Sequence, residues 1–265
     1  MNRILTARDV QRVEAAEHWR QGGVETIDTP DAGRIVVKGQ RPARNPRLYT
    51  ALNTCARLLG VPYLKAAPLT GGAASQATEV ARLRTLRAAG VRVPQVLHVA
   101  DQWFAMQWLG TWPLAVVLRR RELHGGALWR AAGNEMLYIH RAGQYLGQAF
   151  ARNMMVGDDR RLAGMIDFED DPLLVMSLED AQARNWLEYV HSTMWLAPLP
   201  LPEMDDALDA WLTGETPGVR QRFAHACQRL AWLRCLPSQP IFGRDIIALQ
   251  AAAAAAHRWL RRHRI

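Results

Sequence analysis

Short apolar runs separated by turn residues occupy most of the first 108 residues. Apolar clusters of four to eight residues bounded by Gly, Pro, Asn or Asp are typical of strands, and apolar residues recurring every three to four positions are typical of helices. We expect strands over residues 24–27, 34–38, 91–100 and 103–108, and helices over residues 7–21, 48–59 and 73–89. The N-terminal part is therefore predicted to be rich in strands.

Helical patterns dominate after residue 108. The predicted helices cover residues 114–121, 128–140, 178–195, 204–212, 219–236 and 246–262. One hairpin interrupts them, because Met154–Val156 and Leu162–Ile166 are apolar and Gly157-Asp158-Asp159 between them is a turn sequence. This order predicts an α+β fold with two lobes: a small strand-rich N-lobe with an N-terminal helix (residues 1–108), and a helical C-lobe that contains the hairpin (residues 109–265). A cleft between lobes is a common ligand site.

Asn153 and Asp167 flank the two strands of the predicted hairpin. If the strands pair, these residues lie opposite each other at its open end, with the strands about 4.8 Å apart. An amide oxygen and a carboxylate at that separation can share one Mg²⁺, a hard cation that prefers oxygen ligands and substrate phosphates. Protein kinases hold Mg²⁺ with an Asn and a following Asp. The hairpin therefore predicts a metal and nucleotide site.

Two charged residues upstream suit the same chemistry. Lys38 ends the apolar run Ile35-Val36-Val37, and a strand of this kind can direct a cation into a cleft between lobes. Glu79 is the only acidic residue in the predicted helix 73–89, where it can orient the lysine. The alternatives are an edge-strand surface charge for Lys38 and a charge favoured by the helix dipole for Glu79.

The order of these residues carries a resemblance to a known family. Lys38 on a strand, Glu79 on a helix, and Asn153 and Asp167 joined by a hairpin resemble the atypical bacterial kinases. The chain is similar to the lipopolysaccharide core sugar kinases and, more distantly, to the aminoglycoside and choline phosphotransferases, over residues 20–195. The resemblance implies a two-lobed protein-kinase-like fold that uses ATP and Mg²⁺ as cofactors.

The resemblance also implies roles for particular residues around the nucleotide. Lys38 matches the strand lysine that contacts the α- and β-phosphates, and Glu79 matches its helix partner. Residues 105–110 match the hinge that holds adenine through backbone groups, with Met106, Gln107 and Trp108 as the candidate positions.

On the catalytic side, the resemblance makes Asn153 and Asp167 the metal ligands and, with Lys38, candidate catalytic residues. His140 matches a histidine that is more often structural than catalytic. Asp180 is a candidate anchor of the catalytic loop, and the alternative is a charge at a helix N-terminus.

The sequence departs from the kinase pattern at two places. Gln148 occupies the position of the catalytic Asp, where a neutral amide can orient a hydroxyl but cannot accept its proton as a carboxylate does. The run Glu169-Asp170-Asp171 can supply a substitute base or a second metal ligand, or is a solvated acidic turn. No Gly-rich phosphate loop is present, so Gly71-Gly72-Ala73-Ala74-Ser75 either offers N–H groups to an anion or is a turn with Ser75 near the helix cap.

Composition limits the partners and the location. The net charge of the 265 residues is +8, which favours an anionic partner such as a nucleotide, an acidic glycolipid, a membrane surface or nucleic acid, unless the charge is only solvated surface. Arginines cluster at residues 41–47 and 119–121. The three cysteines lack metal-ligand spacing and are expected to be reduced and mostly buried. With no signal peptide and no membrane-spanning stretch expected, the predicted location is the cytoplasm, with the inner face of a membrane as an alternative.

Three functions remain in order of preference. The first is an ATP- and Mg²⁺-dependent phosphotransferase that acts on a hydroxyl of a sugar, a lipid-linked sugar, a small molecule or a protein. The second is a pseudokinase that binds a nucleotide and regulates a protein partner, as Gln148 suggests. The third, contact with nucleic acid through the basic surface, is the least favoured, because the tryptophans fall within apolar elements and are expected to pack in the core.

Overall fold

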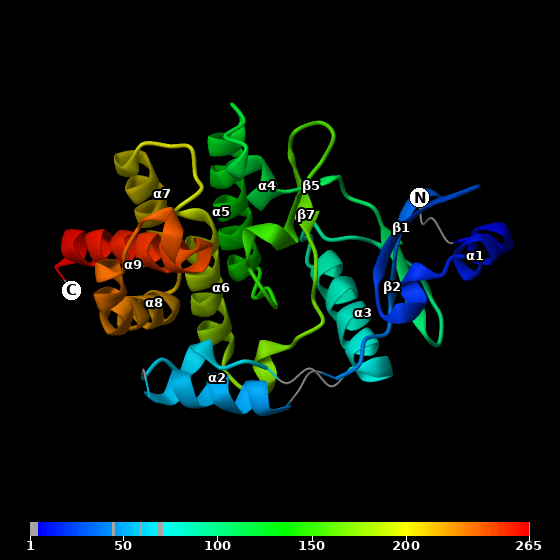
Figure 1. The fold of residues 1–265 in the computed structure, drawn as a ribbon, viewed down its shortest axis with the longest axis horizontal. Coiled ribbons are helices and arrows are strands. Elements are labelled where there is room, and N and C mark those ends of the chain that lie inside the picture. Colours follow the sequence, from blue (N-terminus) through cyan, green and yellow to red (C-terminus); the bar gives the residue numbers. More distant parts are fainter. Residues whose placement is uncertain (1–4, 44–45, 59, 68–70, 265) are drawn as a thin grey trace.

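A strand-rich N-terminal lobe and a helical C-terminal lobe follow one another along the chain (Figure 1). The computed structural model describes residues 5–43, 46–58, 60–67 and 71–264. The helices are α1 (Ala7–Glu14), α2 (Pro46–Leu58), α3 (Gly72–Ala88), α4 (Leu114–Arg119), α5 (Gly125–Arg141), α6 (Leu178–Thr193), α7 (Leu201–Thr213), α8 (Pro217–Leu230) and α9 (Arg244–His263). The strands are β1 (Val24–Thr29), β2 (Gly33–Gly39), β3 (Val96–Val99), β4 (Trp103–Gln107), β5 (Trp112–Pro113), β6 (Met154–Val156) and β7 (Leu162–Met165). Short 3₁₀ helices are η1 (His18–Gln21), η2 (Pro62–Leu64), η3 (Ala151–Asn153), η4 (Pro172–Leu174), η5 (Ala231–Cys235) and η6 (Pro240–Phe242).

The first sheet is antiparallel, with the strand order β1-β2-β4-β3. Side chains on β2 alternate between its two faces, as the period of a strand requires. Ile35 and Val37 pack with Trp19 on the α1 side of the sheet. Val36 packs instead against the cluster that contains α3, and Lys38 reaches the same side. The alternation therefore directs a lysine toward α3 from a central strand.

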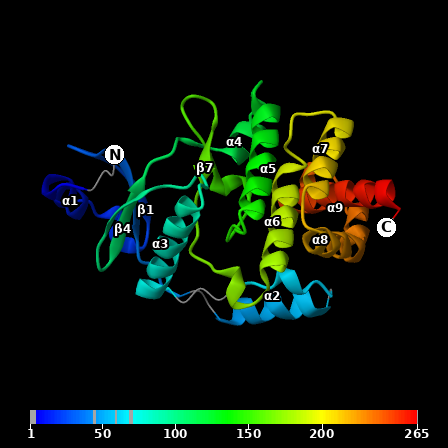
Figure 2. The ribbon, with the colours of Figure 1, turned by 180° about the vertical axis from the view of Figure 1, so that it is seen from behind.

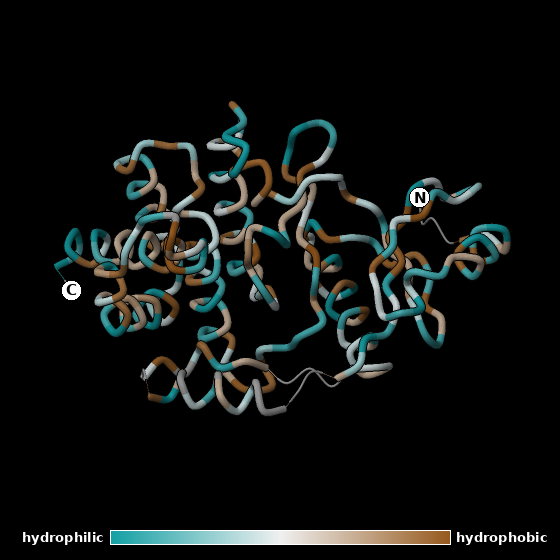
Figure 3. The backbone as a smooth tube through the Cα atoms, viewed as in Figure 1, coloured by the Kyte–Doolittle hydropathy of each residue, from teal (hydrophilic) through white to brown (hydrophobic). Residues whose placement is uncertain are grey.

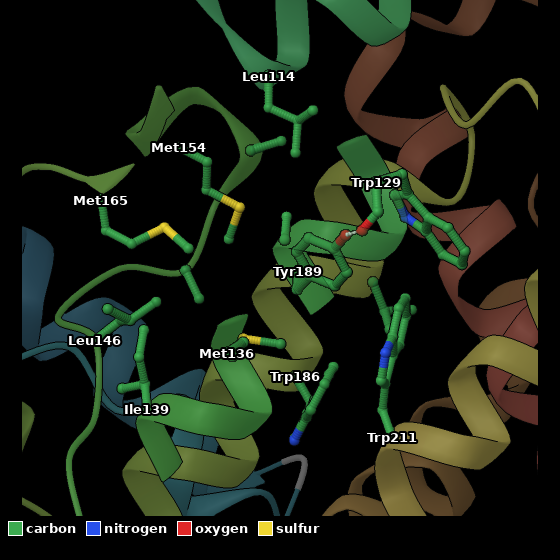
Figure 4. Packing of buried hydrophobic residues seen from close by; sticks show 14 of the residues in the cluster. Leu114, Trp129, Met136, Ile139, Leu146, Met154, Met165, Trp186, Tyr189 and Trp211 are labelled. Atoms are coloured by element: carbon green, nitrogen blue, oxygen red, sulfur yellow. Dashed lines mark hydrogen bonds between the residues drawn. The ribbon is translucent and has the colours of Figure 1, made fainter. Parts of the chain in front are cut away.

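The helical lobe has an aromatic centre (Figure 4). The rings of Trp186 and Trp211 are stacked with centroids 5.6 Å apart, and Trp129 meets Trp211 edge-on at 4.8 Å. Tyr189 donates a hydrogen bond to the carbonyl of Trp129. The same apolar cluster extends through Met154 and continues to α3, so one core spans both lobes. The expected core role is confirmed for these tryptophans and is wrong for Trp112 and Trp232, which are exposed.

The predicted hairpin forms, and β5 adds a third strand to it. Met154 pairs with Met165, and Trp112 pairs with Val156. The tip, residues 157–161, projects from the molecule and is hydrophilic (Figure 3). Residues 109–113, expected to be a connector, therefore contribute a short strand that joins the hairpin to the helical lobe.

Three expected elements differ from those observed. The predicted helix 7–21 ends at Glu14, and the chain turns so that Trp19, in η1, inserts into the core and donates its indole N–H to the carbonyl of Val13. The predicted strand 91–100 is confined to β3, because Pro94 has no N–H to donate. The predicted helix 219–236 ends at Leu230 and continues as η5.

The segment between β2 and α3 crosses to the helical lobe. Helix α2 lies beneath α6 and away from the first sheet (Figures 1 and 2). Val61 and Tyr63, just after α2, form a small buried cluster with Ala226 of α8. The hydroxyl of Tyr63 lies 2.7 Å from Nδ1 of His225. Helix α2 and η2 therefore follow the strand-rich lobe in sequence but lie on the side of the helical lobe.

No helix in the described part of the chain combines the length and hydropathy that a membrane span requires.

Candidate functional site

Lys38 lies at the centre of a buried ionic cluster. Its Nζ lies 2.7 Å from Oε2 of Glu79 on α3. Asp167, two residues after β7, places Oδ1 3.1 Å from the same ammonium, and Oε2 of Glu169 lies 3.5 Å away. Only 6% of Lys38 and 2% of Glu79 is exposed, so neither is a surface charge and β2 is not an edge strand. The structure thus brings three of the predicted site residues together.

The cluster keeps the lysine charged. Burial disfavours an ammonium ion, but attraction to Glu79 and then to Asp167 and Glu169 outweighs that effect and raises the pKa of Lys38. Three carboxylates around one ammonium leave an excess of negative charge. Arg41 partly offsets it, with Nη1 3.7 Å from Oε2 of Glu169. A cation is thereby held in place beside a cleft.

The cleft has a volume of about 520 Å³ and lies between the two lobes. The predicted hinge residues Met106, Gln107 and Trp108 line it. So do Lys38, Glu79, Asn153 and Asp167, which were assigned to the same site. Val36 from the strand-rich lobe and Met155 and Ile166 from the hairpin contribute apolar walls. A pocket of this size with few charged groups on apolar walls is typical of small-molecule sites.

Asn153 and Asp167 both line the cleft at the open end of the hairpin, but the register places Ile166 opposite Asn153 and Asp167 one residue further along. The amide N–H of Ile166 donates to the carbonyl of Asn153 at 2.9 Å, which fixes the register beside Asp167. The side-chain amide of Asn153 donates to the carbonyl of Gln148 at 3.2 Å, which orients that side chain. Asp167 has a φ of 71°, an unusual backbone conformation for a residue with a Cβ.

The donor set fits Mg²⁺. An amide and a carboxylate line one cleft, and Mg²⁺ is commonly bound by one or two protein oxygen groups, with phosphates and water completing the octahedron. Within the described ranges, no group of three or more His, Cys, Asp and Glu side chains is arranged as a closed metal site. Asn153 and Asp167 are therefore residues that could hold an ion arriving with a phosphate.

Gln148 faces a cation. Nη2 of Arg152 donates to its Oε1 at 2.9 Å, and the Arg152 guanidinium lies over the ring of Phe150 at 4.2 Å. The Gln148 side chain is not among those that line the cleft. The residue at the position of a kinase catalytic base is therefore neutral and engaged by an arginine.

Two residues that the sequence analysis missed hold residues 144–153, which we call the catalytic loop because they occupy the position of that loop in the kinase pattern. Oε2 of Glu188 accepts the N–H of Ala149 at 2.8 Å. Asn185, one turn earlier on α6, exchanges hydrogen bonds of 2.8 and 2.9 Å with the backbone of Leu146. The available signal was the spacing of Asn185 and Glu188, which places both on one face of a predicted helix.

Asp180, expected to be a candidate anchor, serves the alternative role. Its carboxylate forms a capping box with Ser177 at the start of α6 and pairs with Arg222 at 2.6 Å. Asp180, in the first turn of α6, faces the neighbouring helix α8. Asn185 and Glu188, one and two turns later on α6, face the catalytic loop instead.

His140 has a structural environment. It is 5% exposed, with Nδ1 2.6 Å from Oε1 of Glu215 and Nε2 3.2 Å from Oδ1 of Asn185. The indole of Trp186 donates to the same Glu215 oxygen. The histidine therefore connects the end of α5 to the residue that holds the catalytic loop, and it does not line the cleft.

The acidic run is not a solvated turn. Glu169 is buried against Lys38, and Asp170 is 5% exposed. Burial raises the pKa of Asp170 to about 6, although Arg184 opposes the shift with Nη2 3.7 Å from Oδ2. Asp171 accepts the N–H of Leu173 and so caps η4. The alternative of a solvated acidic turn is wrong for Glu169 and Asp170.

The glycines before α3 form a fixed turn. Gly71 has a φ of 71°, and a Cβ there would lie 2.3 Å from the backbone nitrogen of Ala43, so no other residue fits. The N–H of Gly72 donates to the carbonyl of Arg41 at 2.8 Å. Ser75 does not cap the helix with its side chain. The turn borders a small side pocket that also contains Lys38 and Arg41.

Other expectations have mixed outcomes. Cys227 is buried as expected. Cys235 is exposed, because α8 ends before it, and the side chain of Cys55 lies outside the described residues.

The arginines of residues 119–121 are solvated, and Arg120 lies over the half-exposed ring of Trp112. Of the first arginine cluster, Arg41 lines the cleft, and the side chains of the other two lie outside the described residues.

A four-stranded antiparallel sheet with a buried lysine–glutamate pair to α3, a cleft at the hinge, and an Asn–Asp hairpin in a helical lobe define a protein-kinase-like fold. No protein-family model matches the sequence. Curated proteins give no match either.

Solved structures provide distant matches, among them two that contain a pseudokinase. The complex of Neurospora crassa PAN2 (WD40-CS1) with PAN3 (pseudokinase and C-term) is 13% identical, with a TM-score of 0.35, and the match covers 91% of this chain and 59% of the other. The Neurospora crassa PAN3 pseudokinase mutant is 13% identical, with a TM-score of 0.34 and coverage of 91% and 58%. The chain thus spans less than two thirds of either matched chain. At this similarity the fold class rests on the elements and contacts of the chain itself.

Proposed function

We propose that the chain binds ATP with Mg²⁺ in the cleft between its lobes and transfers the γ-phosphoryl group to a hydroxyl. One observation carries the proposal: the ammonium of Lys38 is held 2.7 Å from Glu79 and 3.1 Å from Asp167 at the wall of a cleft that Asn153 also lines. A cation fixed beside two candidate metal ligands is the arrangement that protein kinases use to position phosphates.

Each group has a role that follows from its chemistry. Lys38 neutralises phosphate oxygens, and Glu79 keeps it from moving away. The backbone near Gln107 holds the base, and Asn153 and Asp167 are the residues that would hold Mg²⁺, whose charge offsets that of the phosphates. Phosphoryl transfer depends mainly on such positioning and charge neutralisation, so a neutral residue at Gln148 is compatible with activity.

The compound that accepts the phosphoryl group is proposed only as a class, namely molecules that carry a hydroxyl. A hydroxyl of a sugar, a lipid-linked sugar, a small molecule or a protein suits the chemistry equally. The net charge of +8 favours an anionic acceptor such as an acidic glycolipid. The resemblance to lipopolysaccharide core sugar kinases supports the same choice.

Turnover of γ-labelled ATP tests the proposal. Protein incubated with labelled ATP and Mg²⁺ is expected to release or transfer the label, and Asp167→Asn is expected to reduce the rate at least tenfold. Glu203→Gln, at an exposed pair with Arg130, is the control and should leave the rate unchanged. No turnover above that of Asp167→Asn would refute phosphotransferase activity.

A pseudokinase that binds a protein partner is the second candidate, and the Arg152–Gln148 contact favours it, because the base position carries no carboxylate. Thermal unfolding separates the two candidates. ATP with Mg²⁺ should raise the melting temperature in both cases, since a ligand that binds only the native state stabilises it. Stabilisation without turnover would support the pseudokinase, and the absence of any nucleotide-dependent shift would remove both candidates.

A further inference from the structure

A second cavity lies within the helical lobe, apart from the cleft. Its volume is about 380 Å³, and it is bounded by α6, α8, α9 and the segment after α2. Leu187 and Val190 come from α6, Phe223 from α8 and Leu249 from α9, and Leu64 closes it on the side of the crossing segment. These side chains make a mostly apolar wall. We call this cavity the apolar pocket.

The alanine run of α9 creates much of the open space. Ala252, Ala253 and Ala256 line the apolar pocket on one face of that helix. Positions three and four apart on a helix share a face, so three methyl groups stand where larger apolar residues would fill the gap between α9 and α6. The alanine run 251–256 therefore not only favours a helix but also leaves open space between α9 and α6.

One side of the apolar pocket is polar. Arg184, Glu188 and His191 of α6 line it. Nε of Arg184 donates to Glu188 at 2.9 Å, but its Nη1 is buried and has no hydrogen-bond partner in the described part of the chain. An unpaired buried donor is unfavourable, because it has lost its hydrogen bonds to water. A ligand atom that accepts from this guanidinium would remove the cost.

We propose that the apolar pocket binds a neutral amphiphile: a linear or compact apolar group with one hydroxyl or carbonyl group at its end. The apolar part lies along α9, and the polar end meets Arg184, with Glu188 and His191 beside it. The ligand is a small molecule with a hydrocarbon part of roughly ten to fifteen heavy atoms.

The size of the ligand follows from the volume. An apolar cavity of about 150 Å³ in another protein is large enough to bind benzene, which has six carbons. A cavity of about 380 Å³ therefore accommodates roughly fifteen heavy atoms. It also lies within the range of about 300–1,000 Å³ that small-molecule sites occupy.

The charge of the polar end follows from its neighbours. Arg184 already faces two carboxylates, Glu188 at 2.9 Å and Asp170 at 3.7 Å. An anionic end would add a third negative group to them, and a cationic end would approach the guanidinium. Burial lowers the pKa of His191, which favours the neutral imidazole. A neutral hydrogen-bonding group is therefore the best match.

The apolar pocket adjoins the catalytic loop. Phe150 of that loop lines it, and Glu188 holds the N–H of Ala149 at 2.8 Å while also lining the wall. A bound amphiphile would contact residues between Gln148 and Asn153 without entering the cleft. The inference does not depend on whether the cleft binds nucleotide, so its failure and that of the proposed function are distinguishable.

Three probes with one hydrocarbon chain test the proposal: 1-decanol, decanoate and decylamine. Calorimetric titration and thermal unfolding of the full chain at neutral pH measure affinity and stabilisation. We expect 1-decanol to raise the melting temperature by roughly 5 °C at about 100-fold above its Kd. Decanoate and decylamine are expected to bind at least tenfold more weakly than the alcohol.

Two matched variants of α9 locate the site. Ala252→Leu fills the apolar pocket and should weaken 1-decanol binding at least tenfold while leaving the melting temperature equal or higher. Ala254→Leu makes the same change at a position outside the lining and should retain binding. The proposal is overturned if no probe binds, if a charged probe binds better than 1-decanol, or if Ala252→Leu binds 1-decanol as tightly as the unmodified chain does.

Discussion

Nζ of Lys38 lies 2.7 Å from Oε2 of Glu79, and the two side chains, from β2 and α3, are almost completely buried. Forty residues of sequence separate them, including a segment that packs on the other lobe. A buried ion pair loses solvation on both partners, so it is weak evidence for stability by itself. What the pair does is hold the ammonium at the wall of the cleft, which both side chains line.

Breaking this pair from one side is expected to be costly. Lys38→Met leaves Glu79 buried without its main cation, and removing one partner of such a pair typically costs about 3–5 kcal/mol. The double variant Lys38→Met, Glu79→Gln removes both charges and should recover a large part of that loss. Urea unfolding of the single and double variants at pH 7 measures the difference. A double variant as unstable as the sum of the two single changes would contradict the buried pairing.

Because of Asp170, the free energy of unfolding is expected to fall as the pH rises. Its pKa is about 6 in the folded chain and 3.8 in a free side chain, because burial disfavours the carboxylate. The native state therefore binds the proton more tightly, and stability is lost progressively between about pH 4 and pH 6. A difference of roughly two pKa units corresponds to about 3 kcal/mol.

The variant Asp170→Asn isolates this effect. It cannot ionise, so its stability should fall less than that of the unmodified chain between pH 4 and pH 7.5, by up to about 3 kcal/mol. Denaturant unfolding at the two pH values measures the difference. Parallel pH profiles for the two proteins would show that Asp170 does not titrate in this environment.

The sequence predicts the site better than it predicts what supports the site. Lys38 lies on β2, and Asn153 and Asp167 lie within two residues of β6 and β7. The apolar patterns of these short strands are local, so the positions of the three residues follow from the alternation of side chains and from the hairpin. Glu188 and Asn185 are one turn apart on a helix, and only tertiary packing decides that this face meets the catalytic loop.

The burial of the acidic run 169–171 and the path of the segment between β2 and α3 also depend on tertiary packing, so the sequence does not predict them. The acidic run has the composition of a solvated turn, but its position beside Lys38 and Arg184 buries Glu169 and Asp170. The helical pattern over residues 48–59 is ordinary, and nothing local indicates that Val61 and Tyr63 after it pack against α6 and α8. The apolar pocket likewise arises from the way three helices meet.

Gln148 is the position where one substitution distinguishes the two proposed functions. Gln148→Asp supplies the carboxylate that kinases use as a base, and general-base catalysis contributes about 10²–10⁴-fold. Because Arg152 donates to this side chain at 2.9 Å, it should pair with the new carboxylate and reduce the gain to roughly tenfold. Turnover of labelled ATP with Mg²⁺ measures the change.

Gln148→Asn is the control for this prediction, since it retains a neutral amide and should not increase turnover. An increase in Gln148→Asp alone would show that the site is a phosphotransferase limited by its base. No turnover in either variant, with nucleotide binding intact, would favour the pseudokinase.

Glu188 is expected to hold the catalytic loop from α6. Its Oε2 accepts the N–H of Ala149 at 2.8 Å and its Oε1 pairs with Arg184 at 2.9 Å, both in buried surroundings. Glu188→Ala leaves a buried N–H and a buried guanidinium without their main acceptor, so a loss of about 3 kcal/mol or more is expected. Glu188→Gln retains an acceptor and should lose less.

The matched control is Glu203→Ala, which breaks an exposed pair with Arg130 and should cost no more than about 1 kcal/mol. Amide hydrogen exchange gives the direct readout, because the N–H of Ala149 should exchange faster in Glu188→Ala than in Glu188→Gln, while amides of the core helices respond only to global stability. Equal protection of Ala149 in both variants would show that another contact fixes the loop.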